Sequence, residues 1–166
     1  GYLEGTPYLD RLVSSEKIMA KLRGRKSPEE LRRITRAVDE AEEIFAMVTD
    51  VIRPGMTERE VAAFMLEEVD RRGLGTAWER ELCPSVFTGP ESAGAHAGPT
   101  DRRIEKGHVL NIDFGVRAEE YCSDLQRTWY FLKDGETKPP EIVQKAFDTV
   151  RDAIALSAQR IRPGME

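Results

Sequence analysis

The sequence predicts an α+β domain in which long helices pack on a mostly antiparallel sheet. Two observations carry this prediction. Capped amphipathic helices come first along the chain, and short apolar stretches broken by Gly and Pro follow them. A length of 166 residues suits a single hydrophobic core.

Two helix starts are unusually complete. Ser27 followed by Glu30 and Thr57 followed by Glu60 are both capping boxes, in which each residue of the pair binds the backbone N–H of the other. The first is expected to open a long helix that continues to the Pro-Gly pair at 54–55. The second opens a helix that ends near Gly73.

A weaker apolar periodicity predicts a leading helix over residues 8–22. One or two strands are expected over 77–86, and residues 88–103 form a loop rich in Gly, Pro and Ala. Strands at 109–115 and 124–132 follow, joined by a turn at 117–120. Another amphipathic helix begins after Pro140.

The pentapeptide IRPGM occurs twice, at 52–56 and 161–165, each time at the end of a long amphipathic helix. Two interpretations stay open. The copies are either corresponding points in the two halves of a duplicated domain, or two helices that share the same stop signal, because Pro-Gly commonly ends helices.

Composition excludes several classes of function. The excess of acidic over basic residues (30 against 25) and the lack of an extended Lys/Arg run argue against a nucleic-acid partner. No apolar run approaches the roughly 20 residues that cross a bilayer, so we expect no membrane partner and a cytoplasmic location. Two cysteines without CxxC spacing do not indicate a zinc ribbon.

Two aspartates stand in otherwise hydrophobic strands. A turn centred within 117–120 pairs Asp113 directly with Asp124 and places Asn111 and Gln126 on the same face. Like charges about 5 Å apart require compensation, because directly opposed like charges destabilise a sheet. A cation, a shared proton or exposure to water are the three alternatives.

At these residues the sequence resembles the pita-bread metallopeptidases, the family of methionine aminopeptidase, Xaa-Pro aminopeptidase, prolidase and creatinase. The matching residues are Asp113-Phe114-Gly115, Tyr121, Ser123-Asp124 and Arg127-Thr128, preceded by His96 and by Glu105-Lys106-Gly107. The stretches at 25–30 and 53–58 resemble the start of the same catalytic domain. The details from Tyr121 to Thr128 are more similar to the Xaa-Pro branch.

The resemblance implies a dinuclear centre of two divalent ions, manganese first and cobalt or zinc as alternatives, with Asp113 and Asp124 as two of its five ligands. It also implies that His96 contacts the substrate or the tetrahedral intermediate. The reaction implied is hydrolysis of the peptide bond N-terminal to proline by a metal-bound hydroxide. The expected partner is a peptide with proline at its second position.

In this family the fold is an internal duplication, and the other three ligands, one His and two Glu, lie in its second half. We therefore expect residues 28–166 to form the first half of a pita-bread catalytic domain and residues 1–27 to form a linker from an N-terminal domain that is absent here. The chain alone is expected to be inactive and to form a homo-oligomer such as a dimer. The alternative is a non-catalytic peptide- or protein-binding module on the same fold.

Overall fold

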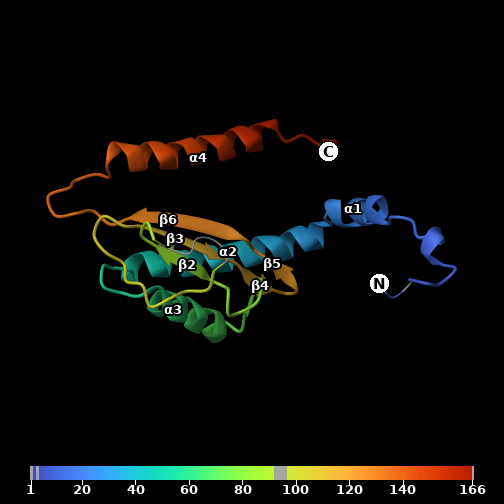
Figure 1. Cartoon of the computed structure of the whole chain (residues 1–166), viewed down its shortest axis with the longest axis horizontal. Helices are drawn as coiled ribbons and strands as arrows, with labels where there is room; N and C mark the ends of the chain where they lie inside the picture. Colours follow the sequence, from blue (N-terminus) through green and yellow to red (C-terminus); the bar gives the residue numbers. More distant parts are fainter. Residues whose placement is uncertain (1, 3, 92–96, 166) are drawn as a thin grey trace.

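The structure is a computed structural model, and it describes residues 2, 4–91 and 97–165. Helices come first and strands follow, as the sequence predicts, before a final long helix (Figure 1). The elements are η1 (Leu9–Arg11), α1 (Glu16–Gly24), α2 (Pro28–Val51), α3 (Glu58–Arg71), β1 (Gly75–Thr76), β2 (Ser85–Thr88), β3 (Val109–Phe114), β4 (Val116–Ala118), β5 (Tyr121–Cys122), β6 (Leu125–Tyr130) and α4 (Glu141–Arg160). The α+β class is confirmed.

Both predicted capping boxes are present. At the start of α2 the Glu30 carboxylate accepts from the Ser27 amide at 2.7 Å, and the Ser27 hydroxyl accepts from the Glu30 amide at 3.3 Å. Thr57 and Glu60 repeat this arrangement at the start of α3, at 2.6 and 3.1 Å. Each box satisfies amides that an isolated helix end leaves without partners.

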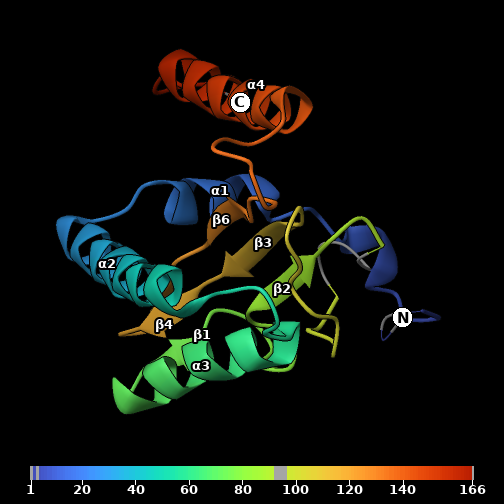
Figure 2. The ribbon, with the colours of Figure 1, turned by 90° about the vertical axis from the view of Figure 1, so that its left-hand side faces the viewer.

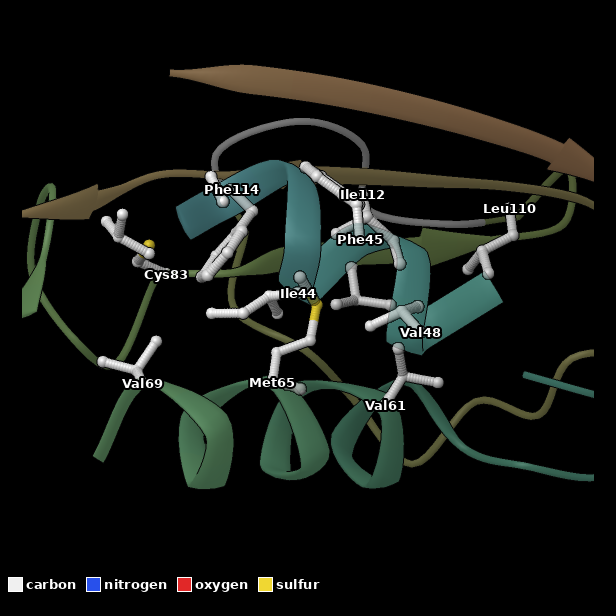
Figure 3. Packing of buried hydrophobic residues seen from close by; sticks show 14 of the residues in the cluster. Ile44, Phe45, Val48, Val61, Met65, Val69, Cys83, Leu110, Ile112 and Phe114 are labelled. Atoms are coloured by element: carbon white, nitrogen blue, oxygen red, sulfur yellow. The ribbon is translucent and has the colours of Figure 1, made fainter. Parts of the chain in front are cut away.

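The core lies between the two capped helices and one face of the sheet β2-β3-β6 (Figures 2 and 3). The buried residues of α2 lie between Ala37 and Val48 at the three- and four-residue spacing of one helix face. The rings of Phe45 and Phe114 meet edge to face with centroids 5.7 Å apart. Side chains from three elements meet here: Ile44, Phe45 and Val48 of α2, Val61, Met65 and Val69 of α3, and Leu110, Ile112 and Phe114 of β3.

The strands form two antiparallel sheets of three strands each, in the orders β2-β3-β6 and β1-β4-β5. Residues 109–130 make one long hairpin that passes through both sheets. Phe114 lies opposite Leu125 in the first sheet, and Arg117 lies opposite Cys122 in the second, so the register is the same on both sides of Gly115. Gly115 marks the point where the hairpin leaves one sheet for the other.

Two predicted elements differ from the structure. The leading helix begins only at Glu16 and has no buried residue, so no core contact extends it over residues 8–15. Most of 77–86 is a turn: the indole Nε1 of Trp78 donates to the Leu82 carbonyl at 3.0 Å, and Pro84 has no N–H to give to a ladder. Within 77–86, strand structure is limited to the first two residues of β2.

The two IRPGM copies have the same local structure. In each, the first Ile amide closes the helix on a carbonyl four residues back, and the Gly has a positive φ, +98° at Gly55 and +90° at Gly164. Only the first copy packs within the described residues, where the Gly55 amide donates to the Ile104 carbonyl at 2.8 Å. Helix α4 lies beyond β6 and buries none of its side chains (Figure 1).

No described helix combines the length and the apolar composition that crossing a membrane requires.

Candidate metal centre

One face of the β3-β6 pair is polar. Strand alternation sends Leu110, Ile112 and Phe114 into the core, and it leaves Asn111 and Asp113 on the opposite side. Gln126 lies directly across from Asp113. We call this surface the polar face; its members are Asn111, Asp113, Gln126 and Thr128. The predicted sharing of a face by Asn111, Asp113 and Gln126 is confirmed.

The predicted pairing of Asp113 with Asp124 is wrong. Asp113 pairs with Gln126, and Asp124 directly precedes β6. The turn lies one residue later than we expected, because Glu119 and Glu120 take positive φ angles of +49° and +66° and close a two-residue loop. This moves the partner of Asp113 by two residues. A register shift of two residues leaves each side chain on the same face of the sheet. Asp124 therefore lies diagonally across from Asp113 instead of directly opposite it.

Asp113 has one satisfied and one unsatisfied oxygen. Gln126 Nε2 donates to Asp113 Oδ2 at 2.9 Å, whereas Asp113 Oδ1 is buried without a hydrogen-bond partner among the described residues. Ser85 lies across from Asp113 on β2, but its hydroxyl donates to the Ala97 carbonyl at 2.9 Å. A desolvated carboxylate oxygen without a donor is costly unless another group compensates it.

Asn111 repeats this arrangement two residues earlier on the same strand. Its Nδ2 donates to Thr128 Oγ1 across the ladder at 2.8 Å, and its Oδ1 is also buried without a partner in the described part of the chain. Two acceptor oxygens on one strand face thus lack donors. Oxygen acceptors of this kind are suited to a hard divalent cation.

Ser123 fixes the backbone that leads into Asp124. The Val116 amide donates to Ser123 Oγ at 3.0 Å, and the Ser123 amide donates to the Val116 carbonyl at 2.9 Å. Gly115 lies so close that a Cβ added there would be 2.1 Å from the Ser123 carbonyl oxygen. The glycine and the serine therefore let the two strands pass closely beside Asp124, whose exposed side chain makes no ion pair with any residue that the structure describes.

The polar face has no cationic side chain of its own. Arg127 follows Gln126 but points to the other side of the sheet, where it pairs with Glu42 at 3.2 Å and lies over the Phe45 ring. Burial raises the pKa of the Cys83 thiol, and the negative charge of Asp113 raises this pKa further. The four residues of the polar face therefore include one acidic side chain and no basic one.

Tyr121 connects the hairpin to helix α2. Its hydroxyl donates to Glu30 Oε1 at 2.9 Å, which ties β5 to the start of α2. This hydrogen bond raises the pKa of Tyr121, and the backbone hydrogen bond from Ser27 lowers the pKa of Glu30. Tyr121 thus holds the hairpin on the helix.

The residues present fit a divalent cation in part. Asp113 Oδ1 is a buried anionic oxygen without a donor, and Asp124 adds a second carboxylate near it. Among residues 2, 4–91 and 97–165, no group of three or more His, Cys, Asp or Glu side chains is placed to hold a metal ion. The carboxylates of Asp113 and Asp124 therefore supply part of the ligand set of a metal centre.

His96 lies outside the described residues. The loop that carries it in the sequence is held at both ends by the buried Glu58 carboxylate. That carboxylate accepts from the Thr88 amide at 2.9 Å and from the Thr100 amide and hydroxyl at 2.9 and 2.6 Å. Our sequence interpretation gave Glu58 no role at the site, placed Gln126 only on the shared face, and used Ser123 only as a residue of the family motif. The position of Glu58 directly after the N-cap residue Thr57 was the sequence signal that could have indicated its role.

Curated relatives of this chain include uncharacterized peptidases. One from Staphylococcus aureus (strain MSSA476) is 31% identical over 145 residues, which are 87% of this chain and 39% of the relative. One from S. aureus (strain MRSA252) is 30% identical over the same shares. The chain spans about two fifths of the length of these relatives.

Solved structures of similar proteins include an X-Pro aminopeptidase from Thermotoga maritima, at 29% identity and a TM-score of 0.70. A prolidase from Thermococcus sibiricus has 26% identity and a TM-score of 0.78. The match to the aminopeptidase covers 83% of this chain and 37% of the aminopeptidase chain. The match to the prolidase covers 91% of this chain and 39% of the prolidase chain. The architecture is part of the pita-bread fold, and residues 32–166 match metallopeptidase family M24. The chain therefore belongs to metallopeptidase family M24.

Proposed function

We propose a metal-dependent peptidase of the Xaa-Pro type, which hydrolyses the peptide bond N-terminal to proline. Membership of family M24 supports peptidase chemistry, and the names of the X-Pro aminopeptidase and prolidase neighbours support the Xaa-Pro branch. The observation that carries the proposal is the buried Oδ1 of Asp113, which has no donor among the described residues and lies on a face with no cationic side chain of its own. A divalent ion compensates such an oxygen.

In this proposal Asp113 and Asp124 hold two divalent ions together with ligands supplied from elsewhere. The ions, when bound, polarise the scissile carbonyl and activate water. His96 contacts the substrate. Ser123 and Gln126 keep the two carboxylates in position, since each is hydrogen-bonded to the hairpin or to a carboxylate of the site.

We further propose that residues 28–166 form the first half of the catalytic domain and residues 1–27 a linker. The other ligands in this proposal are one His and two Glu of a second half. Because two carboxylates bind a dinuclear centre weakly, the 166-residue chain alone is expected to show little or no turnover.

The test compares the 166-residue chain with a longer form of the protein that also supplies the His and the two Glu. Both are given Mn²⁺ and a Xaa-Pro dipeptide, and released proline is measured. Asp113→Asn and Asp124→Asn should abolish turnover in the longer form. Asp134→Asn is the matched control, because Asp134 is an exposed aspartate paired with Lys106 away from the polar face. Full activity of the short chain, or of Asp113→Asn, would refute the proposal.

A non-catalytic binding module on the same fold is the second candidate. The lack of a three-ligand group among the described residues favours it for the chain alone. A module of that kind binds Xaa-Pro peptides equally well with and without a chelator. The metal-dependent enzyme loses both turnover and Mn²⁺ binding when the chelator is added.

Manganese as the metal, a cytoplasmic location and a homo-oligomeric state stay predictions. The exposed apolar side chains of α4, such as Val150 and Ile154, are consistent with self-association. Light scattering of the purified chain at high concentration measures its oligomeric state directly.

A further inference from the structure

The pair Gln126–Asp113 has a geometry that a purely structural cross-strand contact does not need. The two residues are directly opposed in the β3-β6 ladder, and Gln126 Nε2 donates to Asp113 Oδ2 at 2.9 Å. The other oxygen of Asp113, Oδ1, is buried and receives no hydrogen bond from any residue that the structure describes. We propose that Gln126 is a positioning residue for cation binding, which holds Oδ2 so that Oδ1 is presented to the ion.

This inference rests on the proposed metal-dependent function and adds a residue that orients one of its ligands. Gln126 is the side chain that fixes the Asp113 carboxylate within the described residues. Ser85, on the other flanking strand, is buried, but its hydroxyl proton is directed to the Ala97 carbonyl. The rotation of the carboxylate therefore depends on one hydrogen bond from β6.

The chemistry of the donor matters as much as its place. A carboxamide donates a hydrogen bond without bringing a charge, so the full negative charge of Asp113 remains available to a cation. A lysine or arginine at the same position would also donate, but it would compete with the ion. Arg127 is the next residue in the strand, and alternation directs it to Glu42 on the opposite side of the sheet. The register thus places a neutral donor, and not the adjacent guanidinium, against Asp113.

Two substitutions separate positioning from simple structural support. Gln126→Met keeps the length of the side chain and removes the donor. Gln126→Lys keeps a donor and adds a positive charge. Removing an outer-shell partner of a metal ligand typically costs about 10- to 100-fold in metal affinity. We expect Mn²⁺ affinity to fall at least about 10-fold in Gln126→Met and further in Gln126→Lys.

The matched control is Gln144→Met. Gln144 makes a second amide–carboxylate contact in this chain, with Nε2 donating to Asp148 Oδ1 at 3.2 Å on the exposed surface of α4. It lies outside the polar face, so its substitution should leave Mn²⁺ affinity unchanged. Any general effect of replacing a glutamine by methionine appears in this variant as well.

The experiment uses the 166-residue chain with Mn²⁺ alone as the probe, and it follows the paramagnetic broadening of amide resonances at 111–113 and 125–127. Circular dichroism of each variant verifies that it is folded. Local broadening in the wild type with weaker binding in both Gln126 variants supports the inference. Wild-type affinity in Gln126→Met, or restored affinity in Gln126→Lys, overturns it and leaves the proposed function intact. No broadening near Asp113 in the wild type overturns the proposed metal site itself, and the inference with it.

Discussion

Glu58 offers the sharpest test of how the loop beside the polar face is held. Its carboxylate is buried at the start of α3, where one oxygen accepts from the Thr88 amide and the other from the Thr100 amide and hydroxyl. Glu58→Gln keeps the shape of the side chain. It replaces one acceptor oxygen with an NH2 group, and neither orientation of the amide can accept from both backbone amides.

The expected cost follows from these contacts. One buried backbone N–H loses its acceptor, which costs about 1–3 kcal/mol. The negative charge at the first turn of α3 is also lost, and its interaction with the helix dipole contributes about 0.3–1 kcal/mol. We therefore expect Glu58→Gln to lower the free energy of unfolding by about 1–4 kcal/mol.

Urea denaturation followed by circular dichroism measures this change, and hydrogen exchange identifies the amide that has lost its partner. Glu67→Gln is the control, because Glu67 lies exposed on the same helix and should change stability by less than about 0.5 kcal/mol. A loss in Glu58→Gln as small as that of the control, with unchanged exchange at Thr88 and Thr100, would refute the reasoning.

Two further predictions concern the hairpin. Gly115→Ala should destabilise the protein by about 2 kcal/mol or more, because the new Cβ would be 2.1 Å from the Ser123 carbonyl oxygen; thermal unfolding measures this, and an unchanged melting temperature would contradict the close approach. The pKa of Glu119 is lowered by hydrogen bonds from Arg32 and a second arginine of α2, so the stability that this contact provides is present above the carboxyl's unfolded pKa of about 4.3 and is lost as the pH falls through its folded pKa. Unfolding of the wild type and Glu119→Gln from pH 7 downward should show a difference that shrinks below about pH 5, and a difference that grows instead would be the contrary result.

Local sequence signals determined the helices because the interactions that start them are local. Ser27 and Thr57 reach residues only three positions away, and both capping boxes formed as predicted. Where the sequence had no such signal, residues 8–15 form only the short 3-10 helix η1 and residues 77–84 form no strand. A helix or strand of that kind depends on packing that a short apolar pattern cannot specify.

The face of the sheet on which the aspartates lie was likewise determined by the sequence. Alternation has a period of two, so Asp113 and Gln126 share a face in the predicted register and in the observed one. The resemblance to the family was recognised at the same strands, because the motif is a set of residue types at fixed spacing, and the family match extends over residues 32–166.

The register itself was decided only by the tertiary structure. A turn at Glu119 and Glu120 has no sequence signal, since glutamate rarely takes a positive φ. The turn is held there by Arg32 and Arg36 of α2, which bind the Glu119 carboxylate across more than 80 residues of chain. These ion pairs and the Tyr121–Glu30 hydrogen bond are tertiary contacts of the observed register, which the local sequence pattern does not contain. In this register Asp113 lies opposite neutral Gln126, which fixes one carboxylate oxygen, while the other is buried without a partner among the described residues.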